Sequence, residues 1–141
     1  MTPLRSAFKE AGLSGKKIKR GEIWLVPDRE DEHAIDFPED KGKKGNRKYR
    51  GSRPVLITQC ESVATLPTIL VAPCSRSGTN IVSSIEIPGE YKTNGEPTNA
   101  RLHLMQYVLH SHLIEKIGEI PLTTKIFQTI EAETSRVFGL I

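Results

Sequence analysis

Basic residues concentrate in the first half of the chain and could hold a phosphate backbone. Residues 1–53 contain 14 basic and 9 acidic side chains, whereas residues 54–141 contain 6 and 8. Such clusters attract phosphates through ion pairs. A solvated loop, neutralised by the seven acids of residues 28–40, explains the second cluster equally well. The clusters are Lys16, Lys17, Lys19 and Arg20, and then Lys41, Lys43, Lys44, Arg47, Lys48, Arg50 and Arg53.

Arg53 and Ser75 are the residues best suited to act on a phosphate group. Arg53 begins a predicted strand, and its guanidinium can present two parallel N–H donors to phosphate oxygens. Ser75 follows another predicted strand and can donate a hydrogen bond to the same group. Taken alone, an ion pair with a loop acid explains Arg53 more simply, and a turn cap explains Ser75. Lys48, Arg50 and Arg76 are candidates for flanking phosphates, with solvated charges as the alternative.

The cysteines and histidines predict no metal centre. Cys60 and Cys74 stand outside any CxxC motif and are interpreted as small buried hydrophobic residues. His110 and His112 would suit a metal only on a strand, so a structural or surface role is favoured. We therefore expect neither a metal nor a cofactor.

The size and composition of the chain indicate a single globular domain. With 141 residues and a mean hydropathy of -0.35, it is too short for a two-domain enzyme. No apolar run approaches the roughly 20 residues of a membrane helix, and no secretory signal is evident. We expect a cytoplasmic protein that makes no membrane contact.

Short strands dominate the middle of the chain, and a helix ends it. Apolar residues recur at helical spacing from Ile126 to Phe138 behind Thr123 or Thr124 as a cap, which predicts an amphipathic helix. Residues 113–120 are ambiguous. Many short strands with one closing helix predict a mainly β fold, a strongly bent antiparallel sheet or a small barrel. The predicted strands are 21–27, 53–59, 68–74, 82–88 and 101–107.

Two segments lie outside this pattern. Residues 1–18 are predicted to be an N-terminal extension, with a helical stretch at 3–11, that adds little to the core. Residues 28–52 form a polar connection much longer than usual, and long loops in compact domains tend to be functional or disordered. Residues 19–141 would then form one domain that carries the long 28–52 loop.

Several segments together resemble one known family. In their order and spacing they are similar to the PemK/MazF toxins of type II toxin-antitoxin systems, from about residue 19 to the end. The segments are KRGEIWLV at 19–26, GSRPVLI at 51–57, VAPCS at 71–75, IEI at 85–87, LMQ at 104–106 and the terminal FGLI at 138–141.

The resemblance implies an SH3-like small β-barrel, a homodimer and an mRNA interferase, which is a metal-independent endoribonuclease that cleaves single-stranded RNA and leaves 5′-hydroxyl ends. It also implies a cognate antitoxin as partner. The family's catalytic arginine and its threonine or serine match Arg53 and Ser75. Because the pKa of arginine exceeds about 12, Arg53 is expected to stabilise charge, and the general base stays open.

Some features depart from the family or have two interpretations. The extension and the 28–52 loop exceed the family's pattern, so the recognised RNA sequence cannot be read. A hypothesis is that residues 28–40 fold over the RNA groove and oppose RNA, as an acidic antitoxin segment would. Trp24 is interpreted as a core residue rather than a base-stacking one. Gln106 could read a base or hold the dimer, and stays unassigned.

A different class of function stays open beside the nuclease. The barrel also resembles gyrase-poisoning toxins, which act through their terminal helix, and residues 138–141 resemble an aromatic-glycine-isoleucine terminus found there. Packing of an apolar helix explains this ending more simply. An inactive relative that only binds RNA or an antitoxin is a third possibility. The presence of Arg53 and Ser75 favours the nuclease.

Overall fold

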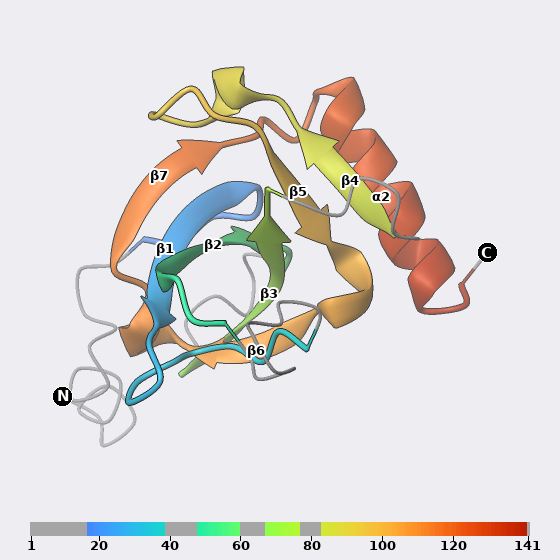
Figure 1. Cartoon of the computed structure of the whole chain (residues 1–141). Helices are drawn as coiled ribbons and strands as arrows, with labels where there is room; N and C mark the ends of the chain where they lie inside the picture. The colour runs from blue at the N-terminus through green and yellow to red at the C-terminus, as the bar shows by residue number, and fades with distance from the viewer. Residues whose placement is uncertain (1–16, 39–47, 60–66, 77–82, 141) are drawn as a thin grey trace, which may run out of the picture.

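Seven strands and one α-helix are present in the part of the chain that the structure describes (Figure 1). The computed structural model describes residues 17–38, 48–59, 67–76 and 83–140. The strands are β1 (Glu22–Asp28), β2 (Gly51–Ile57), β3 (Thr68–Ser75), β4 (Ser84–Ile87), β5 (Thr98–Arg101), β6 (Gln106–Leu109) and β7 (Glu115–Glu119). The helix of these residues is α2 (Lys125–Val137), and their short 3-10 helices are η3 (Gly89–Tyr91), η4 (Leu102–Leu104) and η5 (His110–His112).

The sheet is strongly bent around β3. The strand order is β4-β5-β3-β2-β1-β7, every pair is antiparallel, and β6 also pairs with β3. β3 pairs successively with β6, β2 and β5 along its length, so the chain curls around it (Figure 1). A single bridge between Lys92, just after η3, and Gly118 of β7 joins the two ends of this strand order. The predicted mainly β fold with a closing helix is confirmed.

Strands β1, β2 and β3 are buried on both faces. Because neighbouring side chains of a strand point to opposite faces, Leu56 packs in one core cluster while Val55 and Ile57 pack in another. The first cluster also takes Phe127 and Ile130 of α2. The second is covered by segments outside the sheet, which contribute Ile18, Ala34 and Ile35. Burial of each such side chain contributes about 1.5–3 kcal/mol.

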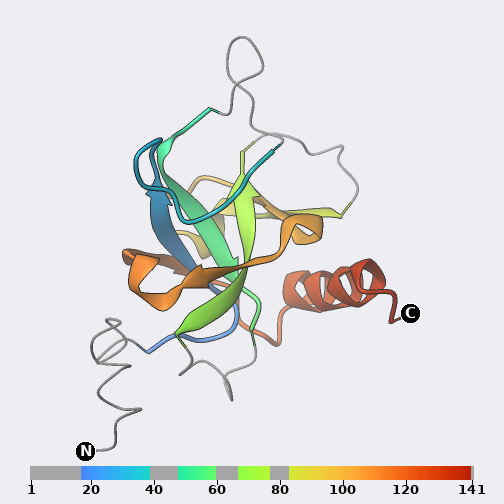
Figure 2. The same cartoon turned by 90° about the horizontal axis from the view of Figure 1, so that it is seen from below.

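The helix α2 forms where the sequence predicts it. Thr124 is the N-cap, and its Oγ1 accepts a hydrogen bond from the backbone N–H of Phe127. The helix packs against β4 and η4 and lies beside the barrel (Figure 2). Beyond it, Phe138 is 57% exposed and Leu140 73% exposed, so the expectation that these residues pack as an apolar helix end is wrong. The chain turns away from the helix axis at Gly139.

The predicted strand at 101–107 is two strands. β5 ends at Arg101, η4 follows, and β6 begins at Gln106. The apolar pattern misled because Leu102 is fully buried within η4, and a buried turn carries the same residues as a buried strand. The ambiguous residues 113–120 contain β7. Within the described residues, no helix has the length and apolar character needed to cross a membrane.

The two irregular segments contribute to the core, contrary to expectation. Ile18, the last residue of the predicted extension, is 6% exposed. Ile35 and Phe37, inside the supposedly polar 28–52 connection, are each 2% exposed. Two apolar residues among many polar ones give no periodic signal, which is why the sequence did not predict their burial. The helical stretch predicted at 3–11 lies outside the described residues.

Candidate active site

A cavity of about 480 Å³ lies between β2, β3, β7 and the segment around Lys92. Its described lining contains four basic side chains and no acidic one. Hydroxyl and amide side chains, including those of Ser75 and Asn94, complete the polar part of the lining. Such a cavity is suited to an anion with several oxygen acceptors. The basic residues are Arg50, Arg53, Arg76 and Lys92.

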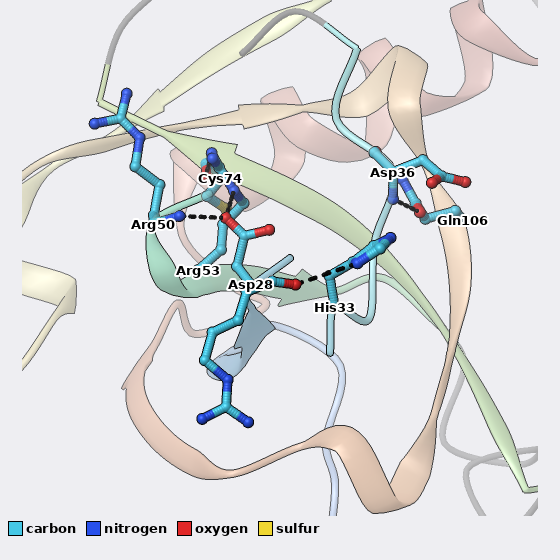
Figure 3. Close-up of polar contacts among 8 residues, drawn as sticks. Asp28, His33, Asp36, Arg50, Arg53, Cys74 and Gln106 are labelled. Atoms are coloured by element: carbon cyan, nitrogen blue, oxygen red, sulfur yellow. Dashed lines mark hydrogen bonds and ion pairs between the residues drawn. The ribbon is translucent and has the colours of Figure 1, made fainter. Parts of the chain in front are cut away.

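Arg53 is held rigidly at the wall of this cavity. Its Nε donates to Oδ2 of Asp28 at 3.3 Å, and its Nη1 donates to the carbonyl oxygen of Cys74 at 3.4 Å. The guanidinium carbon lies 4.2 Å from the ring centroid of Phe37. Figure 3 shows Arg53 and Asp28 facing each other across neighbouring strands. The ion pair with an acid is therefore present, yet Arg53 also lines the cavity.

Asp28 is a site residue that the sequence did not identify. It ends β1, is fully buried, and its Oδ2 also accepts the backbone N–H of Arg50 at 3.0 Å. Val26 is the cross-strand partner of Arg53, so Asp28, two residues further, lies diagonally across on the same face. Only the hairpin register could have revealed this neighbour. Asp28 thus supports Arg53 and the backbone of Arg50, both of which line the cavity.

Gln106 fixes the segment that carries Phe37. Its Oε1 accepts the backbone N–H of Asp36 at 2.7 Å, and its Nε2 donates to the carbonyl oxygen of Asp36 at 2.9 Å. This two-way clamp attaches residue 36 to β6 (Figure 3). Because Phe37 follows directly, the clamp also sets the ring that lies over Arg53. Gln106, which was unassigned from the sequence, thus holds the backbone next to the aromatic residue that covers Arg53.

Ser75 enters the cavity from the end of β3. It is 8% exposed, and it pairs with Asn99 of β5. The Nδ2 of Asn99 donates to the carbonyl oxygens of Ser75 at 3.2 Å and of Arg76 at 3.3 Å. The side-chain amide therefore holds the backbone at the point where β3 ends. Arg53 and Ser75, placed 22 positions apart in the chain, line the same cavity.

The three residues predicted to hold flanking phosphates differ in position. Arg50 and Arg76 line the cavity, and Arg76, whose side chain is 73% exposed, forms an ion pair with Glu96 at the rim. Lys48 is exposed but does not line the cavity. The ring of Tyr49, 5.3 Å from that of His33, connects this stretch to the segment after β1.

Lys92 is the second site residue that sequence reasoning missed. It follows η3, bridges to Gly118 and is 7% exposed, although nothing in the surrounding sequence forms a motif. A β-carbon on Gly118 would lie 2.3 Å from the carbonyl oxygen of Tyr91, so only glycine allows this close approach. Such a contact between distant segments leaves no local sequence signal.

Comparison with known families shows to which of them the chain belongs. A family model described as "PemK-like, MazF-like toxin of type II toxin-antitoxin system" matches residues 19–138. The chain belongs to this family. The resemblance inferred from the sequence is confirmed, and in this PemK/MazF toxin Arg53 and Ser75 line the same cavity.

Solved structures of other toxins share the fold. Toxin MazF-mt6 of Mycobacterium tuberculosis is 17% identical over 84% of this chain and 98% of its own, with a TM-score of 0.58. MazF of Deinococcus radiodurans is 11% identical over 88% and 98%, with a TM-score of 0.63. A mycobacterial endoribonuclease, solved with its cognate antitoxin, is 12% identical over 89% and 98%, with a TM-score of 0.61. No curated protein matches the chain.

Two other candidate residues of this PemK/MazF toxin pack in or against the core. Burial raises the pKa of the Cys74 thiol to about 12, so it is neutral at pH 7 and packs as a small hydrophobic residue, as predicted. Cys60 lies outside the described residues. Trp24 packs against the second core cluster, and its Nε1 donates to Oε1 of Glu22 at 3.0 Å.

The two spaced histidines do not lie on a strand. His110 and His112 form the ends of η5, and His110 is 1% exposed. In the part of the chain that the structure describes, no three side chains of His, Cys, Asp or Glu gather closely enough to hold a metal ion. The described cavity lining likewise offers cations and hydroxyls rather than carboxylate or imidazole ligands.

Proposed function

We propose that this toxin is an endoribonuclease that cleaves single-stranded RNA by metal-independent transesterification, and so acts as an mRNA interferase. One observation carries the proposal: Arg53, immobilised by Asp28, shares a basic cavity with Ser75. A mycobacterial protein of the same fold is an endoribonuclease, which supports the same reaction class.

The chemistry follows from what these side chains can do to a phosphodiester. The 2′-oxygen attacks the phosphorus, the bond to the 5′-oxygen breaks, and the products are a 2′,3′-cyclic phosphate and a 5′-hydroxyl end. The 2′-hydroxyl loses a proton and the leaving 5′-oxygen gains one. The fixed guanidinium of Arg53 stabilises the growing negative charge, and Ser75 donates a hydrogen bond to a phosphate oxygen.

The phosphates next to the cleaved bond bind to the other basic side chains. Arg50 and Arg76, in the cavity wall and at its rim, hold the adjacent phosphates, and exposed Lys48 extends the path. Each such ion pair contributes affinity without base specificity. All of these groups belong to the barrel domain that we propose for residues 19–141.

The partners that we propose are a second copy of the chain and a cognate antitoxin, in the cytoplasm. An acidic or amphipathic antitoxin tail would occupy the basic cavity and compete with RNA for Arg50 and Arg76. The mycobacterial endoribonuclease of the same fold, which was solved in complex with its cognate antitoxin, supports this partner.

A second candidate function has one observation in its favour. Phe138 and Leu140 are 57% and 73% exposed after α2, so the chain presents apolar side chains that a protein partner could bind. A gyrase poison on the same barrel would act there. In that case inhibition of gyrase would be lost in Phe138→Ser and unchanged in Ser75→Ala.

The experiment for the main proposal measures cleavage of a long, weakly structured RNA in EDTA, with analysis of the fragment ends. We expect cuts that leave 5′-hydroxyl ends, slowed about 100-fold in Ser75→Ala and retained in Ser75→Thr, because either hydroxyl can donate. Folded wild-type protein that cuts no RNA, but inhibits gyrase, would replace the proposal with the second candidate.

A further inference from the structure

Lys92 is a largely buried side chain that lines the cavity of the proposed reaction centre. The backbone holds it by two contacts: its N–H donates to the carbonyl oxygen of Gly89 at 3.0 Å, and the N–H of Thr93 donates to that of Ile117 at 2.8 Å. With the Gly118 bridge, these contacts fix where the side chain enters the cavity. Its position is therefore set by the closure of the barrel.

The ammonium has no polar partner among the described residues. Lys92 is 7% exposed, and no hydrogen bond or ion pair connects its side chain to any part of the chain that the structure describes. The carboxylate of Glu96, whose charge acts on Lys92, is paired with Arg76. An ammonium that faces a basic cavity without a counter-charge of its own would be stabilised by a bound anion.

The electrostatic surroundings agree with an anion site. Burial lowers the pKa of Lys92, and the positive charge of Arg76 lowers it further, while Cys74 and Glu96 act in the opposite direction. Cys74 does not neutralise the ammonium, because burial keeps its thiol protonated at pH 7. Arg53 adds a further positive charge to the same cavity. Since Arg53 is paired with Asp28 and Arg76 with Glu96, the ammonium of Lys92 leaves this group of side chains with a net positive charge.

We propose that Lys92 is a further catalytic residue, whose ammonium contacts a non-bridging oxygen of the same phosphate that Arg53 and Ser75 address. The inference rests on the proposed function for the identity of that phosphate as an RNA linkage. The transition state carries more negative charge on these oxygens than the substrate does. Removal of the contact should therefore lower kcat more than it raises KM.

The first experiment tests the anion site without RNA. Lysine side chains are labelled with ¹³C, the Lys92 signal is assigned by its loss in Lys92→Met, and its titration is followed in inorganic phosphate and in chloride of equal ionic strength. We expect phosphate to raise the pKa of Lys92, because the anion favours the charged form, and to leave exposed Lys125 unchanged. Identical Lys92 titrations in the two salts would overturn the proposal. Since no cleavage is involved, this result is independent of the proposed function.

The second experiment separates a catalytic role from a structural one. Lys92→Met, which keeps the length of the side chain, should lower kcat about 100-fold, change KM little and melt at or above the wild-type temperature. Lys92→Arg should restore part of kcat. Lys125→Met, which removes the same charge from the surface of α2, should cleave as wild type does. Wild-type kcat in Lys92→Met, or loss of cleavage with a markedly lower melting temperature, would overturn the proposal.

Discussion

The Nε atom of Arg53 lies 3.3 Å from Oδ2 of Asp28, and the two side chains are only 3% and 0% exposed. Desolvation of both charges costs free energy that their mutual attraction must offset. The pair therefore acts as a unit: each charge is tolerated only in the presence of the other. Any substitution of Arg53 alone changes stability as well as chemistry.

Asp28→Asn is expected to lower the free energy of unfolding by about 3–5 kcal/mol, because it leaves a buried guanidinium without its counter-charge. Urea denaturation measures the effect. Asp31→Asn is the matched control: its carboxylate, 82% exposed, pairs with Arg29 at the surface and should matter by less than about 1 kcal/mol. Equal costs for the two variants would argue against a buried pair.

Gln106→Ala is expected to loosen the segment over Arg53. The variant loses both hydrogen bonds to the backbone of Asp36, which should cost about 1–3 kcal/mol and slow RNA cleavage as Phe37 moves. Denaturation and single-turnover cleavage give the two quantities. Gln128→Ala, on the exposed face of α2, provides the control. If Gln106→Ala cleaves at the wild-type rate, the clamp has no part in positioning Arg53.

Gly118→Ala is expected to disturb the closure of the barrel at Lys92. Its β-carbon would lie 2.3 Å from the carbonyl oxygen of Tyr91, so the backbone must move, at a cost of about 2–4 kcal/mol. At Gly139, where φ is +73° and an added β-carbon would meet no described atom within 4 Å beyond the neighbouring residues, alanine should cost only about 1 kcal/mol. Thermal melting compares the two, and a smaller cost at residue 118 would contradict the close approach.

Lys92→Met is expected to change how stability depends on pH. Burial lowers the folded-state pKa of Lys92 below its ordinary 10.5, so the unfolded chain binds more protons between the two values. The stability of the wild-type protein relative to Lys92→Met should therefore rise as pH increases through the folded pKa towards 10.5. The comparison is made in a Cys74→Ala background, because the charges of Cys74 and Lys92 act on each other's pKa. If the stability difference between the two proteins does not change with pH, the pKa of Lys92 is not lowered in the folded state.

The strands and the helix could be predicted because their residues repeat with local periods. Thr124 and the apolar face behind it predict α2, and the apolar runs of β1 and β3 predict strands within a residue or two. The sequence misassigned Leu102 to a strand and did not predict the burial of Phe37. In both places an apolar residue is buried outside a strand or α-helix.

The candidate site could be predicted only in part. Arg53, Ser75, Arg50 and Arg76 were identified from residue type and family resemblance, and the structure brings them into one cavity. Asp28 and Lys92 depend on hairpin register and on the contact of η3 with β7, which are long-range features without a local pattern.

The central claim is that the charge of Arg53, held by Asp28, drives RNA cleavage. Its most direct test is the double variant Asp28→Asn/Arg53→Gln, which removes both charges together, keeps groups that can hydrogen-bond and so avoids an unpaired buried ion. Single-turnover cleavage in EDTA is measured alongside thermal melting. We predict a folded protein whose cleavage rate falls about 1,000-fold. A folded double variant that cleaves RNA within about threefold of the wild-type rate would contradict the account.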